Sequence, residues 1–523
     1  MNEAVKSVVE ASFHRRYLTL VDEIERNFPV AHWKRGDLEV WPLARMELYL
    51  DMYWANVGRP RPELRPFPFR PLARAARPLR NAWSSRGDLA HFVARPKPAH
   101  AIFLGDGVSL DYVDGGWRDR FGEPLIAALE RRGRSTFLMQ SGDLSRLPWH
   151  RPTYAANLVA GRGYQPNFDT ASPLELPSHD AVIALLKHNG IRAASLDREN
   201  LSRSASVVAA TAAEFERVMR IVKPTLGFVV TYYAGLGHSF LLACRRLGVL
   251  SVDLQHCPQE GAHKAYGWAA LPKTGYAVLP AVFWNWSAED AATIRRWTST
   301  LGSPWHRSLH GGHTQLAPFL SDDDPATMQW DTRVESIGAG AVFEREILVA
   351  LQPISGHRAR WDALAAQIEA GPASWRWWIR RHPASSPLQD EEYKSVVSLR
   401  KPNVVVEQTS SLPLPALLRH MSILLSLASG SAAEAAAFGV PAIFLIDDAR
   451  GPFAGLIEKG LATVVDVSAI QDVIARTQKV PQRPSIARAP DIGETVADLE
   501  RIAGGYARLC ASGAGHPERV QIA

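Results

Sequence analysis

The residues with the clearest potential to bind an anion lie near the C-terminus, in a run of small side chains. Ser429-Gly430-Ser431 follows the apolar run 423–427 and precedes an alanine-rich segment, 432–438, that is predicted to be a helix. A turn of this kind leaves backbone N–H groups and the positive end of a helix dipole available to an anion. Glu434 lies on the first turn of the predicted helix, where its carboxylate can accept hydrogen bonds from the hydroxyls of a ribose or sugar.

A second candidate group ends the tryptophan-rich segment Trp375–Ile379 and has the sequence Arg380-Arg381-His382-Pro383. An imidazole here can donate to a phosphate or a base, and the proline restricts the turn that orients it. Because side chains alternate along a strand, one of the two arginines is expected to face the ligand, and we assign Arg381 to that role. Gln352, after the predicted strand 347–351, completes the set. Together with the serine-rich turn, these residues predict a nucleotide-sugar site; the alternative is a capped turn with a satisfied histidine.

Two further residues are placed to accept a proton. His256 stands in Gln255-His256-Cys257, directly after the predicted buried strand 250–254, and its ordinary pKa of about 6.5 suits general-base catalysis at neutral pH. The alternative is a strand-end histidine that is hydrogen-bonded to the backbone. Asp114 follows the first strand of the same series, where a carboxylate could deprotonate an acceptor hydroxyl. Asp114-Gly115-Gly116 is also ordinary turn chemistry.

The elements that must position these residues are apolar strands alternating with helices. One series begins at Ala101 and contains the clear strand–helix–strand unit 226–254. The second begins at Ile347 and runs through the serine-rich turn to residues 464–465. Such alternation predicts parallel sheets covered by helices on both faces. The predicted fold class is α/β, with two Rossmann-like doubly wound domains that face a cleft, and ligands are expected beyond the carboxyl ends of the strands.

The same pattern predicts the domain organisation. Helical periodicity at 4–27 and 42–54 indicates a helical N-terminal extension. The stretch from Trp284 to Glu344 has no clear periodicity, so we expect loops and a connection between domains. The predicted parts are the helical extension with a basic arm, an acceptor domain, a donor domain, and a C-terminal helix with a tail, at residues 1–98, 99–340, 341–490 and 491–523.

Composition is that of an ordinary globular protein, with 46% hydrophobic and 21% charged residues. The three cysteines, Cys244, Cys257 and Cys510, form no motif, so neither a disulfide framework nor a zinc site is expected. We find no secretory leader, no apolar run of about eighteen residues, and no P-loop, zinc-protease or serine-hydrolase motif. The expectation is a cytoplasmic protein with neither a metal nor a nicotinamide cofactor.

The net charge of +6 is unevenly distributed. Between residues 59 and 97 there are ten Arg or Lys residues and two acids, interspersed with aromatic residues and leucines. Such a segment can lie on an anionic membrane surface, each basic residue contributing about 1 kcal/mol near it. This predicts a peripheral position on the inner face of the cytoplasmic membrane; the alternative is a solvated, proline-broken linker. Nucleic acid is not an expected partner, because no nucleic-acid-binding module accompanies the arm.

The motifs resemble those of GT-B glycosyltransferases that build bacterial surface polysaccharides. His382-Pro383 and Ser429-Gly430-Ser431 look like the His-Pro and Ser-rich motifs with which bacterial sialyltransferases and Kdo transferases hold the CMP portion of a CMP-sugar. Gln255-His256-Cys257 is similar to the Gln-His-Gly or Trp-His-Gly turn of capsule and teichoic-acid-type transferases, whose histidine is a proposed catalytic residue; here cysteine replaces the glycine. Val113-Asp114-Gly115 matches the last two positions of the acidic motif of sialyltransferases. The resemblance covers residues 100–480.

The resemblance implies a glycosyltransferase that moves a sugar such as Kdo or a sialic acid from a CMP-linked donor to a bacterial polysaccharide, a lipopolysaccharide or another lipid-linked glycan. His256 or Asp114 would be the base, and a metal would not be required, because serines, a histidine and a helix dipole can stabilise the leaving nucleotide. The nucleotide-binding residues would be Gln352, Arg381, His382, Pro383, Ser429, Gly430, Ser431 and Glu434. The alternatives are a CDP-alditol phosphotransferase, a UDP-sugar 2-epimerase and a non-catalytic sugar-binding protein.

Overall fold

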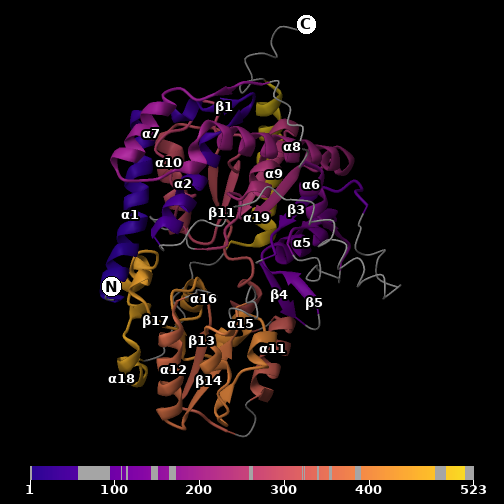
Figure 1. The fold of residues 1–523 in the computed structure, drawn as a ribbon. Helices are drawn as coiled ribbons and strands as arrows, with labels where there is room; N and C mark the ends of the chain where they lie inside the picture. The colour runs from indigo at the N-terminus through magenta and orange to yellow at the C-terminus, as the bar shows by residue number, and fades with distance from the viewer. Residues whose placement is uncertain are drawn as a thin grey trace. The chain divides into compact units, whose positions relative to one another are not determined.

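The computed structural model describes residues 3–56, 95–107, 109–113, 116–142, 151–163, 172–257, 259, 263–320, 322, 324–337, 341–352, 356–382, 390–477 and 490–512. The chain forms two units (Figure 1). The N-terminal unit comprises Ser12–Ser109, Asp119–Gly312 and Pro490–Ala523; the C-terminal unit comprises Met1–Ala11, Leu110–Arg118 and His313–Ala489. None of the described helices is long and apolar enough to cross a membrane.

The N-terminal unit is built on seven parallel strands in the order β12-β11-β10-β9-β3-β6-β7. These strands are β3 (Ala101–Gly105), β6 (Thr136–Gln140), β7 (Thr153–Ala155), β9 (Leu226–Val230), β10 (Leu250–Leu254), β11 (Val282–Asn285) and β12 (Arg307–His310). The central strands are short apolar runs because both faces of the sheet are covered. On β3, Ile102 and Leu104 enter the core on one face, and Ala101 and Phe103 enter the core on the other.

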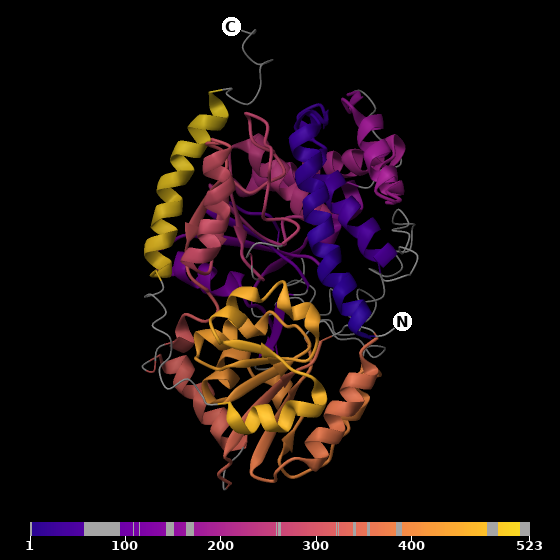
Figure 2. The same ribbon diagram turned by 90° about the vertical axis from the view of Figure 1, so that its left-hand side faces the viewer.

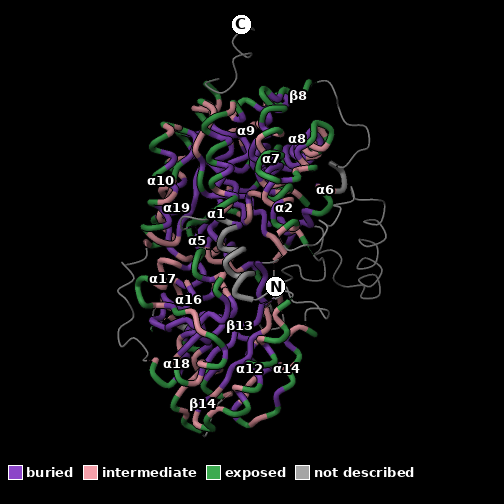
Figure 3. Tube along the Cα trace, turned by 60° about the vertical axis from the view of Figure 1, so that its left-hand side comes forward, coloured by how far each residue is buried: buried purple, intermediate pink, exposed green. Residues whose placement is uncertain are grey.

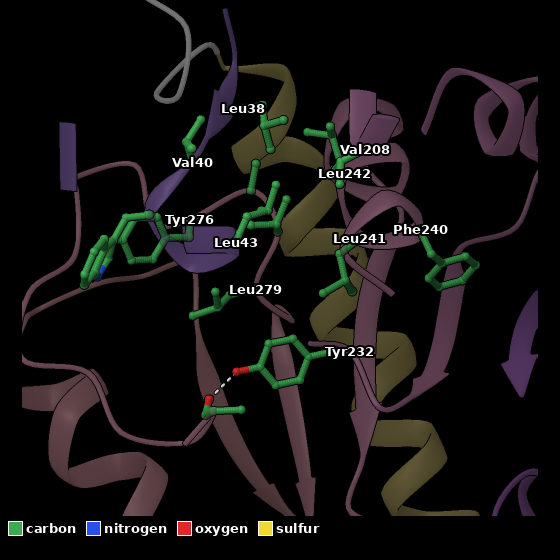
Figure 4. Packing of buried hydrophobic residues seen from close by; sticks show 14 of the residues in the cluster. Leu38, Val40, Leu43, Val208, Tyr232, Phe240, Leu241, Leu242, Tyr276 and Leu279 are labelled. Carbon is green, nitrogen blue, oxygen red and sulfur yellow. Dashed lines mark hydrogen bonds between the residues drawn. The ribbon is translucent and has the colours of Figure 1, made fainter. Parts of the chain in front are cut away.

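Helices pack on both faces of this sheet. One core contains residues of α1 (Glu3–Asn27), α2 (Trp41–Asn56), α6 (Asn157–Gly163), α7 (His179–His188), α8 (Arg198–Val222), α9 (Gly235–Leu247) and α10 (Ala288–Thr300). The opposite core contains α5 (Gly122–Arg131) and α19 (Ile492–Ala511), the long yellow helix of Figure 2. A small antiparallel sheet joins β1 (Lys34–Arg35) to β2 (Leu38–Glu39) and β8 (Leu174–Glu175). Figure 4 shows part of the first core, in which the Tyr232 hydroxyl donates to the Ala265 carbonyl.

The C-terminal unit is built on six parallel strands in the order β15-β14-β13-β16-β17-β18. They are β13 (Arg345–Ala350), β14 (Trp375–Arg380), β15 (Val404–Val405), β16 (Ile423–Ser426), β17 (Ala442–Phe444) and β18 (Ala462–Val464). One face is covered by α11 (Pro325–Ile337), α15 (Leu414–His420) and α16 (Ser431–Ala437), the other by α12 (Arg358–Ala370), α14 (Lys394–Val397) and α18 (Ile470–Arg476). Strand β13 is largely buried between them, as its purple trace in Figure 3 indicates.

Both sheets have a doubly wound strand order. The chain first adds strands on one side and then returns to add strands on the other, so its direction reverses between β3 and β9 in the N-terminal unit. The corresponding reversal in the C-terminal unit lies between β13 and β16. Doubly wound sheets bind ligands beyond the carboxyl ends of the strands at such a reversal. The predicted α/β class with two Rossmann-like units is confirmed.

The region from Trp284 to Glu344 is more regular than the sequence analysis expected, and the prediction of loops there was wrong. Strands β11 and β12 extend the N-terminal sheet, and helix α10 packs in the core on one of its faces. Helix α11 packs in the C-terminal unit. The edge strand β12 is polar and nowhere fully buried, so it lacks an apolar run. Helix α10 sends few apolar side chains into the core, chiefly Ile294 and Trp297, so its periodicity is weak.

Candidate functional site

The residues predicted to bind the nucleotide follow three adjacent strands of the C-terminal sheet. Ala350 on β13 is the register partner both of Arg380 on β14 and of Ser426 on β16. The residues that follow these strands are Gln352, Arg381 with His382, and Ser429. Three segments that are far apart in sequence therefore end at the same carboxyl edge, at the reversal between β13 and β16.

Hydrogen bonds hold the serine-rich turn at this edge. The buried Gln352 side chain accepts a hydrogen bond through Oε1 from the Ala428 N–H at 2.7 Å, which ties the end of β13 to the turn after β16. Ser429 donates its N–H to Ser426 Oγ at 3.2 Å. Its own Oγ accepts from the Ser431 hydroxyl at 2.7 Å. Ser429 and Gly430 are partly exposed, so the turn is both fixed and accessible.

The helix after this turn is short. Ser431 is the first residue of α16, one position earlier than predicted, and Gly430 is its N-cap. Because α16 has only seven residues, we attribute any anion binding at this edge to side chains rather than to a helix dipole. Glu434 lies on the first turn, as predicted, and is buried, with 5% of its surface exposed.

The two arginines that end β14 have different environments. Arg380 is buried, and its guanidinium donates to the carbonyls of Thr409 (2.9 Å) and Leu412 (2.5 Å), so it is bonded within the unit. Arg381 is partly exposed and forms an ion pair with Glu407 at 3.4 Å. His382 is also partly exposed. Pro383 lies outside the described residues.

The N-terminal sheet carries a second group of polar residues at its own reversal. Asp106 follows β3 and Thr231 follows β9; the Thr231 hydroxyl donates to Asp106 Oδ2 at 2.7 Å. The other carboxylate oxygen accepts from the Ser109 N–H at 2.7 Å. Thr231 has a φ of 61°, a left-handed conformation that is uncommon for a β-branched residue. Strained backbone at the carboxyl edge of a doubly wound sheet is typical of a ligand site.

His256 lies beside this reversal, after β10, and is partly exposed. Its Nε2 is 3.0 Å from the hydroxyl of Tyr233. The pKa of His256 is lowered to about 4, chiefly by burial; the charge of Asp106 opposes this shift, and the charges of Lys264 and Arg120 contribute to it. Burial raises the pKa of Tyr233 well above 10. At neutral pH the phenol is therefore protonated and the imidazole neutral, and in the tautomer whose proton is on Nδ1 the Tyr233 hydroxyl donates to Nε2.

Lys264 completes the group from the connection between β10 and β11. Its partly buried ammonium lies over the ring of Tyr49 at 4.8 Å and over the ring of Tyr233 at 5.1 Å. Burial lowers the pKa of Lys264. Tyr49 is on α2, so this N-terminal helix reaches the site. We call Asp106, Thr231, Tyr233, His256 and Lys264 the switch-point cluster.

Sequence analysis identified only His256 among these five residues. Asp106 and Thr231 each directly follow an apolar strand of the structure, β3 and β9, and a polar residue at the end of an apolar run was a usable signal. No sequence signal connects Tyr49 with Lys264, which are brought together by the packing of α2 against the unit.

The two neighbours of His256 are structural. Gln255 is buried; its Oε1 accepts from the Trp286 N–H at 2.7 Å, and its Nε2 donates to the Cys257 carbonyl at 3.0 Å. The amide therefore fixes the turn in which cysteine replaces the expected glycine. Burial raises the pKa of Cys257 to about 12, so its thiol is protonated at neutral pH and a poor nucleophile.

Asp114 lies outside the described residues. The chain on either side of it forms a hairpin of β4 (Leu110–Val113) and β5 (Gly116–Asp119), and residues 110–118 belong to the C-terminal unit. In that unit the buried carboxylate of Asp111 accepts from Gln315 Nε2 at 3.4 Å. Most of the basic arm, residues 57–94, is also outside the described part of the chain. Within the described part, no group of three or more His, Cys, Asp or Glu residues could hold a metal ion.

Comparison with known proteins finds similarity of the three-dimensional structure but none of the sequence. The sequence matches no protein-family model and no curated protein sequence. Similar solved structures include UDP-GlcNAc 2-epimerase from Neisseria meningitidis bound to UDP-GlcNAc (13% identity, TM-score 0.46, 77% of this chain and 100% of that one). Others are UDP-GlcNAc 2-epimerase from Methanocaldococcus jannaschii (11%, 0.44, 77% and 99%) and the glycosyltransferase SnogD from Streptomyces nogalater (14%, 0.40, 79% and 98%). Because these TM-scores are below 0.5, the fold assignment rests on the two parallel sheets themselves.

Proposed function

We propose that this chain is a glycosyltransferase that moves a sugar from a CMP-linked donor to a hydroxyl of a glycan acceptor. One observation carries the proposal: Gln352, Arg381 with His382, and Ser429 meet at the carboxyl edge of a doubly wound sheet, at its reversal. This is where such sheets bind nucleotides. The choice of cytidine follows the resemblance of His382-Pro383 and Ser429-Gly430-Ser431 to motifs of CMP-sugar transferases.

At the donor site, the accessible groups are suited to the charge of a leaving nucleotide. His382 and Arg381 donate to phosphate or base, and the Ser429 hydroxyl can donate as well, because its oxygen already accepts from Ser431. Gln352 fixes the serine-rich turn by accepting a hydrogen bond from the Ala428 N–H. Donors that are fixed before the reaction stabilise developing negative charge without reorganisation.

At the switch-point cluster, the acceptor hydroxyl loses its proton as it attacks. Its oxygen forms a bond to the anomeric carbon of the donor, and the bond from that carbon to the phosphate oxygen breaks, which releases CMP. The hydroxyl proton passes to the Tyr233 oxygen while the Tyr233 proton passes to His256 Nε2, along the 3.0 Å hydrogen bond. The resulting imidazolium is stabilised by Asp106, whose charge raises the pKa of His256.

The first experiment is thermal unfolding with CMP, CDP, UDP and GDP at millimolar concentration. A ligand at about a hundred times its Kd stabilises the folded state by roughly 2.7 kcal/mol. We expect CMP to stabilise the wild type but not His382→Ala. The matched control is His188→Ala, at an exposed histidine of the N-terminal unit, which should keep the CMP shift. A CMP shift that survives in His382→Ala contradicts the proposed site, and no nucleotide shift contradicts a donor-binding function.

Product analysis then distinguishes the rival activities. The donors to compare are CMP-sialic acid, CMP-Kdo and CDP-glycerol. Because all three release CMP, the group found on the acceptor, a sugar or an alditol phosphate, separates the two activities. A preference for UDP together with interconversion of UDP-sugars without an acceptor would identify a 2-epimerase. We expect His256→Gln to keep the CMP shift and to lose about 10²–10⁴-fold in transfer rate. A His256→Gln variant with wild-type transfer would favour a role outside catalysis for this residue. The bacterial glycan acceptor and the membrane contact of the basic arm remain predictions.

A further inference from the structure

We propose that the switch-point cluster binds an anionic group of the acceptor, a carboxylate or a phosphate, on the ammonium of Lys264. The inference rests on the proposed function, because it assigns a ligand class to the acceptor side of that reaction. It concerns a residue that no sequence motif marks.

Lys264 is a partly buried cation for which the described part of the chain supplies no acidic partner. Among the described residues, no carboxylate forms an ion pair with its Nζ, which lies 4.8 Å from the ring centre of Tyr49 and 5.1 Å from that of Tyr233. Two other partly or fully buried cations of the same unit are paired with acids: Arg45 with Glu25 at 3.0 Å, and Arg246 with Asp37 at 2.7 Å. Removing an ammonium from water is unfavourable unless an anion compensates it. Two aromatic faces compensate in part, so the site is prepared for an anion.

The position of Lys264 places this anion beside Tyr233 and His256, the pair proposed to accept the proton of the acceptor hydroxyl. Tyr233 presents its ring to the ammonium and its hydroxyl to His256 Nε2 at 3.0 Å. A group held on Lys264 therefore has its neighbouring hydroxyl close to the Tyr233–His256 pair. The members of the cluster are each partly exposed, so a ligand can reach them.

An anion on Lys264 also improves the base. The positive charges of Lys264 and Arg120 lower the pKa of His256, and Asp106 is the charge that raises it. A bound carboxylate or phosphate offsets the charge of Lys264. The imidazole then accepts a proton more readily in the complex than in the free protein, so an acidic acceptor is favoured over a neutral one.

The test measures binding of two anions and their neutral counterparts by titration calorimetry: glycerol 3-phosphate against glycerol, and glucuronate against glucose. We expect the wild type to bind at least one anion at least tenfold more tightly than its neutral counterpart, and the preferred anion distinguishes phosphate from carboxylate. Lys264→Met should weaken that binding at least tenfold, about 1.4 kcal/mol, and Lys264→Arg should retain most of it. Lys273→Met, at an exposed lysine of the same connection, is the matched control and should bind as the wild type does. Equal binding by wild type and Lys264→Met, or no binding of either anion to the wild type, would overturn the proposal.

A stability measurement separates a ligand site from a structural lysine. If Lys264 is retained for a ligand, Lys264→Met without ligand unfolds at the wild-type temperature or above it, because an uncompensated ammonium has been removed. A lowered unfolding temperature would instead show that its contacts with Tyr49 and Tyr233 are structural, and would overturn the proposal. The CMP shift of the donor site should persist in Lys264→Met, so failure of this inference and failure of the proposed function give different results.

Discussion

At the scale of single residues, burial decides the protonation states at the carboxyl edge of the N-terminal sheet. It lowers the pKa of His256 to about 4 and raises that of Tyr233, so the pair is neutral when the protein is at neutral pH. The nearby Asp119 shows the same effect on a carboxyl group. Only 1% of Asp119 is exposed, and burial raises its pKa to about 7, with Asp106 adding to the increase. Its Oδ1 accepts from the N–H groups of Phe121 and Gly122, both at 3.1 Å, at the start of α5.

Asp119 predicts a pH-dependent stability. The folded state holds this proton more tightly than the unfolded state, so the wild type loses stability as the pH rises from about 4 through about 7. Asp119→Asn keeps an oxygen that can accept the two N–H bonds but removes the titration. We therefore expect urea unfolding to show the wild type losing roughly 2–3 kcal/mol relative to Asp119→Asn between pH 5 and pH 8. Parallel pH dependences of the two proteins would refute this assignment.

At the scale of elements, helices α1 and α2 hold the connection that carries Lys264. Glu25 on α1 accepts from Arg45 and Trp41 on α2, both at 3.0 Å, and from the Ala269 N–H at 2.6 Å. The Arg45 guanidinium lies 4.2 Å from the ring centre of Trp268. Both charged side chains are almost completely buried. The helical N-terminal extension thus supports the acceptor side of the proposed site.

This buried pair predicts non-additive mutations. Arg45→Met leaves the carboxylate of Glu25 buried without its cation, and we expect a loss of about 3–5 kcal/mol in the free energy of unfolding. The double variant Glu25→Leu/Arg45→Met removes both charges and should lose less than Arg45→Met alone. Urea unfolding of the two variants measures the difference. If the double variant is less stable than Arg45→Met, the two residues act independently. The ion pair would then not be what holds the segment between β10 and β11 that carries Lys264.

At the scale of the whole molecule, the last segment of the chain belongs to the N-terminal unit. Helix α19 follows the C-terminal sheet in sequence, yet Val496 and Leu499 are fully buried in the N-terminal core with residues of β3, β9 and β10. The cap of α19 is the Asp491 side chain, which accepts from the Glu494 N–H at 2.9 Å.

Leu499→Ala should therefore destabilise the N-terminal unit selectively. We expect a loss of about 2–5 kcal/mol, as for other buried leucines. Amide hydrogen exchange should show faster exchange in β9 and β10 and unchanged protection in β13 and β16. Arg501→Ala, at an exposed position of the same helix, is the control and should stay within about 0.5 kcal/mol of the wild type. Lost protection in β13 and β16 as well would mean that the two units unfold together.

Much of the architecture is encoded locally and could be predicted from the sequence. Apolar runs such as 101–104 and 347–351 are long enough to specify buried strands by themselves, and their spacing from helical segments implies parallel, doubly wound sheets. Residues directly after such strands must lie at the carboxyl edge, so the positions of His256, His382 and Ser429 followed from sequence. The polar edge strand β12 could not be predicted, because an exposed strand needs no apolar pattern.

The sequence by itself therefore determined the α/β class, the apolar strands of the two series and which residues follow those strands. Only the tertiary structure decided which of those ends become neighbours. Strand order places Asp106 beside Thr231, and helix packing places Tyr49 over Lys264, although 215 positions separate the latter pair. The physical reason is that strand and helix patterns arise from contacts between near neighbours, whereas sheet order and helix docking depend on burial summed over the whole unit. The charge states of His256, Tyr233 and Asp119 follow from that burial, so they too were decided by the fold.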